Sequence, residues 1–225
     1  EEEVPRPIYS VVRPAGLVGL LPVATRAAII LEIQRQMARG GSGYEKLKHD
    51  KQWYWYTKNE YGEWIYYLYY PHNVKFDGQN WITGVATAKT PAGPFIDQGP
   101  LKNGKMGMDP MVFIDHNGEA YIYSNSLIVA KLNPDMVSLA ESPRKISYAP
   151  ANVINDENLR FGEGSYMHKK DGVYYFSYSN FHNDVYQGFY AMGDNPYGPF
   201  EWKGPMAPNP QGAQDHHSVI EFKDK

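Results

Sequence analysis

The sequence predicts an all-β chain folded as a β-propeller, in which small sheets called blades are arranged around an axis. Three stretches begin with a turn glycine and continue into a tyrosine-rich strand: Gly62–Tyr69, Gly118–Tyr123 and Gly172–Tyr178. They recur at intervals of about 55 residues, and a fixed period built from strands and turns is typical of blade arrays. A second repeat, Thr90–Phe95 and Asn195–Phe200, ends both times in Gly-Pro-Phe and is followed by a Gly-Pro pair.

The composition supports this fold class and excludes several functions. The 225 residues include 19 tyrosines, 5 tryptophans, 21 glycines and 17 prolines, which favours strands joined by turns. Aromatic faces also stack well on sugar rings, although packing between blades explains any single one of them equally well. A net charge of −3 without a Lys/Arg stripe gives no footprint for nucleic acid. The absence of cysteine excludes disulfides, thiolate metal sites and cysteine nucleophiles.

No segment of the sequence predicts contact with a membrane. The longest apolar runs, Ala15–Leu21 and Ala27–Leu31, are too short to span a bilayer and are separated by Pro22 and Arg26. The acidic start Glu1–Glu3 does not have the composition of a signal peptide. The residues alone therefore leave the compartment unknown.

The chain divides into two parts of different texture. Residues 1–43 contain a helical pattern from Thr25 to Ala38 and end in Gly40–Gly43, which has the composition of a flexible linker. We predict that this segment is atypical, being foreign or joined by a linker, and that residues 44–225 form an incomplete propeller. The incompleteness is inferred from the end of the chain at Lys223–Lys225, a turn-like sequence whose partner strand is missing.

Strand signals follow one another regularly from Trp53 onward. Asn117-Gly118 is a signal for a two-residue type I′ turn, and Asp171-Gly172 marks a second hairpin. The expected strands are Trp53–Tyr56, Trp64–Tyr70, Trp81–Thr87, Met111–Ile114, Ala120–Ser124, Leu127–Leu132, Tyr166–Lys169, Val173–Tyr178, Gln187–Met192 and Val219–Phe222.

Two acidic residues have a context that suggests chemistry. Asp109 comes immediately before Pro110, which keeps it out of the α region and restricts its side chain. A plain Asp-Pro turn is the simpler interpretation. Glu163 stands between two glycines and is flanked by Phe161 and Tyr166. Aromatic walls would raise the pKa of its carboxyl, as a general acid requires, whereas the simpler interpretation is a mobile glycine loop.

Other candidate sites are weaker. His216 and His217 are neighbours, so on a strand only one of them faces the axis, and a metal site made from both is not expected. The segment starting at Asp115 lacks the later glutamate of a calcium loop and is predicted to be a hairpin turn. Motifs of serine hydrolases, nucleotide-binding loops and zinc peptidases are absent from the sequence.

Taken in order, the motifs resemble glycoside hydrolase family 43, whose members are five-bladed β-propellers that cleave α-L-arabinofuranosides and β-xylosides. The resemblance covers roughly residues 53–225. The motifs that carry it are Ile82-Thr-Gly-Val-Ala-Thr87, Met108-Asp-Pro-Met-Val-Phe-Ile-Asp115, Glu163-Gly-Ser-Tyr-Met-His-Lys169, Tyr175-Phe-Ser-Tyr-Ser179, Asn195-Pro-Tyr-Gly-Pro-Phe200, Asn209-Pro-Gln-Gly212 and His216-His-Ser-Val-Ile-Glu-Phe222.

The resemblance implies an inverting hydrolase with three carboxylates. Glu163 matches the general acid, Asp109 matches the aspartate that tunes and orients it, and His216 matches the axial histidine near the sugar, which faces a calcium or water cluster in many members. Phe161 and Tyr166 are predicted to contact substrate. No cofactor is implied beyond a possible structural calcium. The general base should be an aspartate in the first blade, but residues 1–49 contain none, and Lys48–Lys51 around Asp50 does not match its motif.

The resemblance implies a plant cell-wall oligo- or polysaccharide as substrate, with hemicellulose such as arabinoxylan favoured, and an extracellular or periplasmic location. Loss of a general base typically lowers a rate by about 10²–10⁴, so the sequence predicts a poorly active chain. The alternative function is a carbohydrate-binding propeller without catalysis. Five-bladed fructosidases are a further relative, but their motifs do not occur in this sequence.

Overall fold

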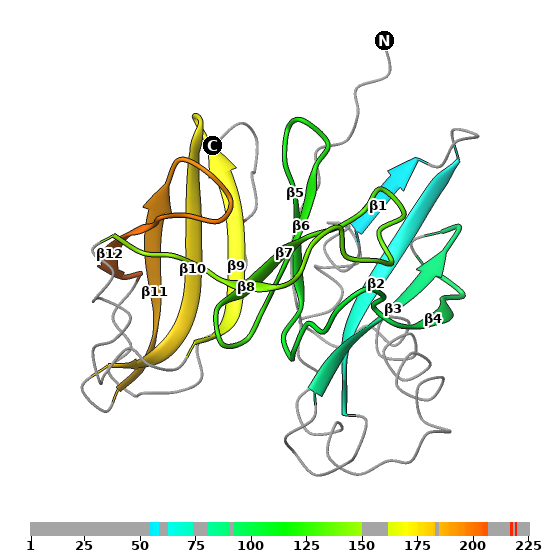
Figure 1. Cartoon of the computed structure of the whole chain (residues 1–225), viewed down its shortest axis with the longest axis horizontal. Helices are drawn as coiled ribbons and strands as arrows, with labels where there is room; N and C mark the ends of the chain where they lie inside the picture. The colour runs from blue at the N-terminus through cyan, green and yellow to red at the C-terminus, as the bar shows by residue number, and fades with distance from the viewer. Residues whose placement is uncertain are drawn as a thin grey trace.

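Three four-stranded antiparallel sheets make up the described part of the chain (Figure 1). A computed structural model describes residues 55–58, 63–73, 81–90, 92–149, 162–182, 185–206, 217 and 219. The strands in chain order are β1 (Trp55–Lys58), β2 (Trp64–Asn73), β3 (Trp81–Ala88), β4 (Ile96–Pro100), β5 (Met111–Ile114), β6 (Ala120–Ser124), β7 (Ile128–Lys131), β8 (Arg144–Lys145), β9 (Glu163–Lys170), β10 (Val173–His182), β11 (Val185–Gly193) and β12 (Glu201–Pro205).

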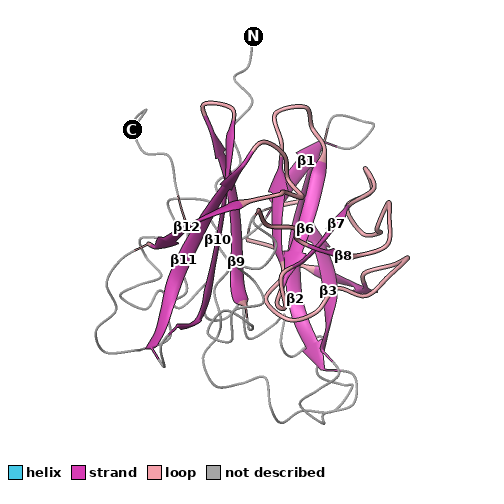
Figure 2. Ribbon diagram, turned by 60° about the vertical axis from the view of Figure 1, so that its left-hand side comes forward, coloured by secondary structure: helices cyan, strands magenta, loops and turns pink. Residues whose placement is uncertain are grey.

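Each sheet is formed by four strands that follow one another along the chain. We call β1–β4, β5–β8 and β9–β12 the first, second and third sheets, and in each of them every strand pairs with the next. Figures 1 and 2 show the three sheets standing side by side, with the second sheet between the other two. The long tyrosine-rich strands of the repeat are β2, β6 and β10, which are the second strands of the three sheets.

The two described turns of the glycine repeat differ from each other. Asp171 and Gly172 both have positive φ values, 52° and 82°, between the paired residues Lys170 and Val173, which is a type I′ turn. The predicted type I′ turn at Asn117-Gly118 is wrong, because only Gly118 has a positive φ. There the loop is one residue longer: the amide of Asp115 donates to the carbonyl of Glu119, and Asp115 Oδ1 accepts the amide of His116.

The Gly-Pro-Phe repeat shapes the outermost strand of the first and third sheets. The peptide bonds Gly93-Pro94 and Gly198-Pro199 are both cis. A strand follows each of them, β4 or β12, and each is interrupted by a register shift against its neighbour. The glycines of the later Gly-Pro pairs, Gly99 and Gly204, lie next to these shifts with positive φ. The sequence repeat is therefore a structural repeat, although β4, β8 and β12 were not predicted as strands.

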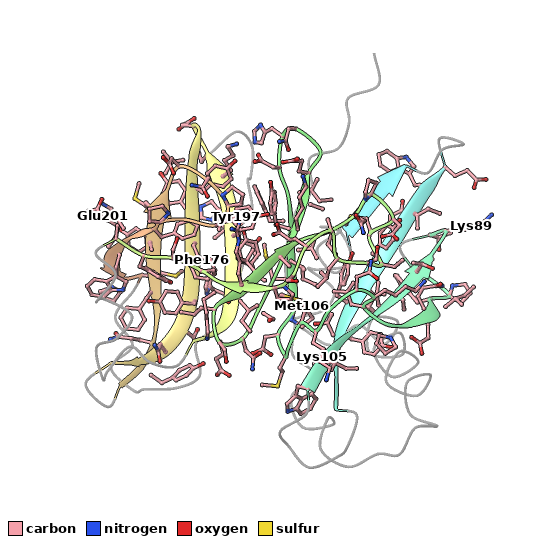
Figure 3. The ribbon with its side chains drawn as sticks, in the orientation of Figure 1. Lys89, Lys105, Met106, Phe176, Tyr197 and Glu201 are labelled. Atoms are coloured by element: carbon pink, nitrogen blue, oxygen red, sulfur yellow. The ribbon has the colours of Figure 1, made fainter. Side chains whose placement is uncertain are left out.

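The main core lies between the sheets. The Phe176 face of β10 packs toward the second sheet, where the rings of Tyr123 and Phe176 lie 5.8 Å apart. On the other side, the hydroxyl of Tyr69 in β2 donates to the carbonyl of Met136 at 2.6 Å. Figure 3 marks Phe176 in β10 and Met106 in the segment that joins β4 to β5, both of them buried in this core.

Several sequence predictions fall outside the described residues. They include the atypical segment 1–43 with its helix and linker, and all of the predicted strand Val219–Phe222 except Val219. The division into two parts at residue 44 therefore stays a prediction. Within the described ranges no helix has the length and apolar character to cross a membrane.

Replacement of Phe200 by alanine tests the packing of the Gly-Pro-Phe repeat. Phe200 is fully buried against Phe176 and Tyr148, so Phe200→Ala should lower the free energy of unfolding by about 3–5 kcal/mol. Ile96, which follows Phe95 of the first repeat, is 66% exposed, so Ile96→Ala should change the free energy of unfolding by less than about 0.5 kcal/mol. Urea denaturation of both variants measures the difference; equal effects would contradict the packing described.

Candidate functional site

Asp109 lies two residues before β5 and is 3% exposed. Its φ of 55° is left-handed, which is uncommon for a residue other than glycine and differs from the extended backbone that a following proline favours. The segment leading to it is held from two sides. Thr83 Oγ1 of the first sheet donates to the carbonyl of Gly107 at 2.8 Å, and the amide of Gly107 donates to Ser124 Oγ of the second sheet at 3.2 Å. Asp109 is therefore presented from a fixed backbone rather than from a loose turn.

Glu163 is the first residue of β9 and is 5% exposed. The regular pairing of β9 with β10 ends at Tyr166 opposite Ser177, and the next paired residue, Glu163, lies opposite Ser179. Two residues of β9 therefore oppose one residue of β10, which is a β-bulge. Gly164, with a φ of 58°, supplies the left-handed conformation that such a bulge uses.

The bulge decides which way the Glu163 side chain points. Without the bulge, regular alternation of the same residues would put Glu163 on the same face of the sheet as Met167, which belongs to the face that packs toward the second sheet. With it, Glu163 lies on the opposite face, together with Tyr166 and His168. The predicted mobile glycine loop is thus not what these glycines form: they lie beside and within a paired strand.

One turn of the second sheet holds the backbone beside both carboxylates. We call Ser124–Ser126 the bridging turn. The amide of Asn125 donates to the carbonyl of Met108 at 2.9 Å, and the amide of Met108 donates to Asn125 Oδ1 at 3.1 Å. The amide of Ser126 donates to the carbonyl of Gly162 at 2.7 Å. Since Met108 precedes Asp109 and Gly162 precedes Glu163, the two carboxylates enter their strands on either side of this turn.

The packing of the strands places Asp109 and Glu163 at the same end. β5 and β9 are the first strands of neighbouring sheets and contact each other. Asp109 and Glu163 each stand at the start of their strand, so two buried carboxyl groups enter adjacent sheets from one side. Burial of this kind is a setting in which carboxyl groups act as acids and bases.

Tyr186 of β11 contacts Glu163 directly. Its hydroxyl donates to Glu163 Oε1, and the tyrosine is buried. The sequence analysis did not single out Tyr186, and its flanking residues Val185 and Gln187 carry no motif that would have identified it.

The remaining predicted residues have different outcomes. Tyr166 is 1% exposed, and its hydroxyl donates to the carbonyl of Val219 at 2.8 Å, so its role in substrate binding stays a prediction. Phe161 and His216 lie outside the described residues. The neighbour of His216 is described: His217 Nε2 lies 2.6 Å from Ser177 Oγ, and its ring contacts that of Tyr166. The segment at His217 therefore meets the face of the third sheet on which Glu163 lies.

A possible structural calcium also stays a prediction, because His216 is not among the described residues. In the ranges that the structure covers, no group of three or more His, Asp or Glu side chains is placed to hold a metal ion.

At the opposite end of β5 and β9, a second polar cluster ties the two sheets together. Lys169 Nζ lies 2.9 Å from Asp115 Oδ1, and the hydroxyl of Tyr174 donates to Asp115 Oδ2. Burial would raise the pKa of Asp115, but hydrogen bonds from Tyr174, Lys169 and the His116 amide outweigh it and lower this pKa. The Asp115 carboxylate is therefore held charged and serves as a link between sheets.

The sequence of this chain is similar to those of known proteins. The sequence model described as Glycosyl hydrolases family 43 matches residues 42–225. A xylosidase/arabinosidase of Bacteroides ovatus is 34% identical over 193 residues, which is 71% of this chain and 58% of the relative. A β-xylosidase of Xylanibacter ruminicola is 34% identical over 174 residues, covering 63% of this chain and 54% of the relative. The chain thus spans between half and three fifths of these two relatives.

Solved structures agree with the sequence comparison. A β-xylosidase/α-arabinofuranosidase from a compost microbial metagenome, crystallised with xylotriose in a calcium-free form, has a TM-score of 0.64 and 31% identity, covering 76% of this chain and 62% of that one. An enzyme of Xanthomonas citri in complex with xylose has a TM-score of 0.62 and 27% identity, covering 76% and 60%. The predicted all-β propeller fold is confirmed by these neighbours and, within the described residues, by the three sheets.

His168 gives the third sheet a dependence on pH. Burial, reinforced by the nearby His217 and Lys170, lowers the pKa of His168 from 6.5 to about 4. The folded state therefore binds a proton at His168 less readily than the unfolded chain does. As a result, the free energy of unfolding decreases as the pH falls from about 6.5 to about 4. Between pH 7 and pH 5 this loss should be about 1 kcal/mol, after allowing for solvent screening of the partly exposed ring.

Chemical denaturation at pH 7 and pH 5 measures this contribution. The variant His168→Gln, which cannot titrate, should lose about 1 kcal/mol less than the native chain over this interval. Groups that do not interact with His168 titrate equally in both proteins, so they cancel in the comparison. Identical pH dependence of the two proteins would show that His168 does not titrate abnormally.

Proposed function

This chain belongs to the glycosyl hydrolases of family 43, and from that premise we propose that it serves in the cleavage of glycosidic bonds of hemicellulose. Glu163 acts as the general acid, and Asp109 orients this acid and tunes its proton affinity. The observation that carries the proposal is the placement of both carboxyl groups, nearly buried, at the same end of two contacting strands. The bridging turn fixes the backbone beside each of them.

The chemistry needs a proton at the leaving oxygen and a nucleophile at the sugar carbon. In an inverting hydrolase, a carboxylic acid protonates the glycosidic oxygen while a carboxylate on the opposite side of the sugar deprotonates the attacking water. Glu163, held at the start of β9 and pointed away from the core by the bulge, supplies the proton. In its charged form Asp109 favours the protonated form of Glu163, since like charges close to each other disfavour double ionisation.

The general base is not among the residues that we assign. Family resemblance puts it in the first blade, where residues 1–49 contain no aspartate. We therefore propose that this chain performs the acid half of the reaction and activates water poorly. The β-xylosides and α-L-arabinofuranosides of plant cell walls are the proposed substrates, supported by the similarity to enzymes named xylosidase and arabinofuranohydrolase. An extracellular or periplasmic location, where such polymers occur, is proposed with them.

A nucleophile that needs no deprotonation tests proton donation by Glu163 separately from the activation of water by a general base. With water alone, we expect hydrolysis of xylobiose and of aryl β-xylosides to be slow or undetectable. Azide is already an anion, so its addition should restore cleavage and give the inverted α-xylosyl azide. Glu163→Gln should lower the azide-supported cleavage of xylobiose by about 10²–10⁴. Chromatography of the released xylose and xylosyl azide measures both reactions.

Two other outcomes would contradict parts of this proposal. Rapid hydrolysis in water that is abolished by Glu163→Gln would show that a general base is present after all. Binding of xylo-oligosaccharides that survives the double variant Asp109→Asn/Glu163→Gln, without cleavage in water or azide, would indicate a carbohydrate-binding propeller instead. Isothermal titration calorimetry with xylotriose distinguishes this second case.

A further inference from the structure

Tyr186 makes a contact that the general reaction scheme does not use. Its hydroxyl donates to Glu163 Oε1, although the two residues are on different strands, β11 and β9, with β10 between them. Both side chains are buried, at 4% and 5% exposure. A tyrosine that reaches across a whole strand to a buried carboxyl group needs an open path and a fixed direction.

The residues between them provide that path. Glu163 lies opposite Ser179 on β10, and Ser179 lies opposite Gly188 on β11. Next to Glu163 this row therefore has the small side chain of Ser179 on β10 and then Gly188 on β11, which has no side chain. Tyr186 is two residues from Gly188, so it stands on the same face of the sheet and can lie over Ser179 toward Glu163.

The bulge is what makes this contact possible. If Gly164 and Ser165 continued the regular pairing of β9 instead of forming a bulge, Glu163 would lie on the other face of the sheet, out of reach of Tyr186. The direction of Glu163 and the position of Tyr186 are thus two parts of one arrangement.

We propose that Tyr186 is a positioning residue for the general acid: its hydroxyl donates to Oε1 of Glu163 and so fixes the direction in which the carboxyl group presents its transferable proton. This inference rests on the proposed function for its catalytic meaning. The hydroxyl of Tyr186 donates and stays protonated throughout. The proton of the Glu163 carboxyl group passes to the glycosidic oxygen as the bond between that oxygen and the sugar carbon breaks, and Glu163 is left as a carboxylate.

The same hydrogen bond favours the transfer itself. A hydrogen bond to an ionised carboxylate is roughly twice as strong as one to a neutral acid, so the Tyr186 contact strengthens as Glu163 loses its proton. It therefore makes Glu163 a stronger acid while fixing the direction of its carboxyl group. Asp109 acts in the opposite direction, because its charge favours the protonated form.

Titration of Glu163 by NMR tests this assignment without needing turnover. In protein labelled with ¹³C at the glutamate carboxyl carbons, the Glu163 resonance is identified by its loss in Glu163→Gln. Tyr186→Phe removes only the hydroxyl and should raise the titration midpoint of Glu163 by about one pH unit. The matched control is Tyr190→Phe, since Tyr190 lies on the same face of β11, two residues beyond Gly188, and should leave the midpoint unchanged.

A second measurement keeps the tyrosine in place. In protein labelled at the tyrosine ¹³Cζ, Glu163→Gln replaces the carboxylate acceptor by an amide, and the Tyr186 resonance should move while that of Tyr190 does not. This measurement still tests the contact between Tyr186 and Glu163 if Tyr186→Phe fails to fold. A Glu163 midpoint unchanged in folded Tyr186→Phe, or a Tyr186 resonance indifferent to Glu163→Gln, overturns the proposal.

Azide-supported cleavage then connects the contact to catalysis. Protonation matters most for a poor leaving group, so Tyr186→Phe should slow cleavage of xylobiose by about 10-fold or more and leave that of 2,4-dinitrophenyl β-xyloside nearly unchanged. Equal slowing of both substrates would mean that Tyr186 does not act through the acid. If the NMR shifts occur but neither substrate is cleaved by the native chain, the contact stands and the proposed function fails.

Discussion

The constraint on which the site depends is the hydrogen bonding of the bridging turn, Ser124–Ser126, to the chain before each of two strands. Through Asn125 it holds Met108, and through the amide of Ser126 it holds Gly162. These bonds involve backbone atoms of residues 54 positions apart and fix where two neighbouring sheets begin relative to each other. Asp109 directly follows Met108 and Glu163 directly follows Gly162, so main-chain geometry sets where the two side chains begin. A rigid first strand is the kind of support that catalytic groups require, because small errors in position lower rates strongly.

Close packing around this turn explains the glycines that surround it. A Cβ atom at Gly107 would lie 2.3 Å from Asn125 Oδ1, and one at Gly162 would lie 2.3 Å from Leu127 Cδ2. Both glycines therefore allow the chain before a carboxylate to approach the second sheet. At the far end of β5 and β9, the charged Asp115–Lys169 pair with Tyr174 joins the same two sheets. The two strands are thus held at both ends, by neutral backbone bonds beside the carboxylates and by a partly buried ion pair away from them.

Much of this arrangement follows from local sequence signals, and the rest depends on pairing between strands. Strand periodicity and turn glycines predict β2, β6 and β10, and the Gly-Pro-Phe repeat marks two equivalent places in two sheets. Asp109 and Glu163 were predicted because proline and glycine restrict or free the backbone beside them. The Asn117-Gly118 turn was mispredicted, because the side-chain oxygens of Asp115 and Asn117 accept hydrogen bonds from nearby backbone amides and so stabilise a longer loop. The bulge of β9 and the partner Tyr186 depend on the register of three strands, which no short segment specifies.

The register of the strands also explains how a buried glutamate can act as an acid instead of only lowering the stability of the fold. A carboxyl group on the Met167 face would be enclosed by apolar side chains of the second and third sheets, where it would stay neutral and have no access to a ligand. Because a bulge forms at Gly164, Glu163 lies on the face that the His217 segment meets, where Tyr166, Ser177 and Tyr186 offer polar atoms. On that face the charged form of Glu163 has a hydrogen-bond donor in the Tyr186 hydroxyl. A bulge, made possible by a glycine with positive φ, thus keeps Glu163 out of the apolar core and in the position of an acid.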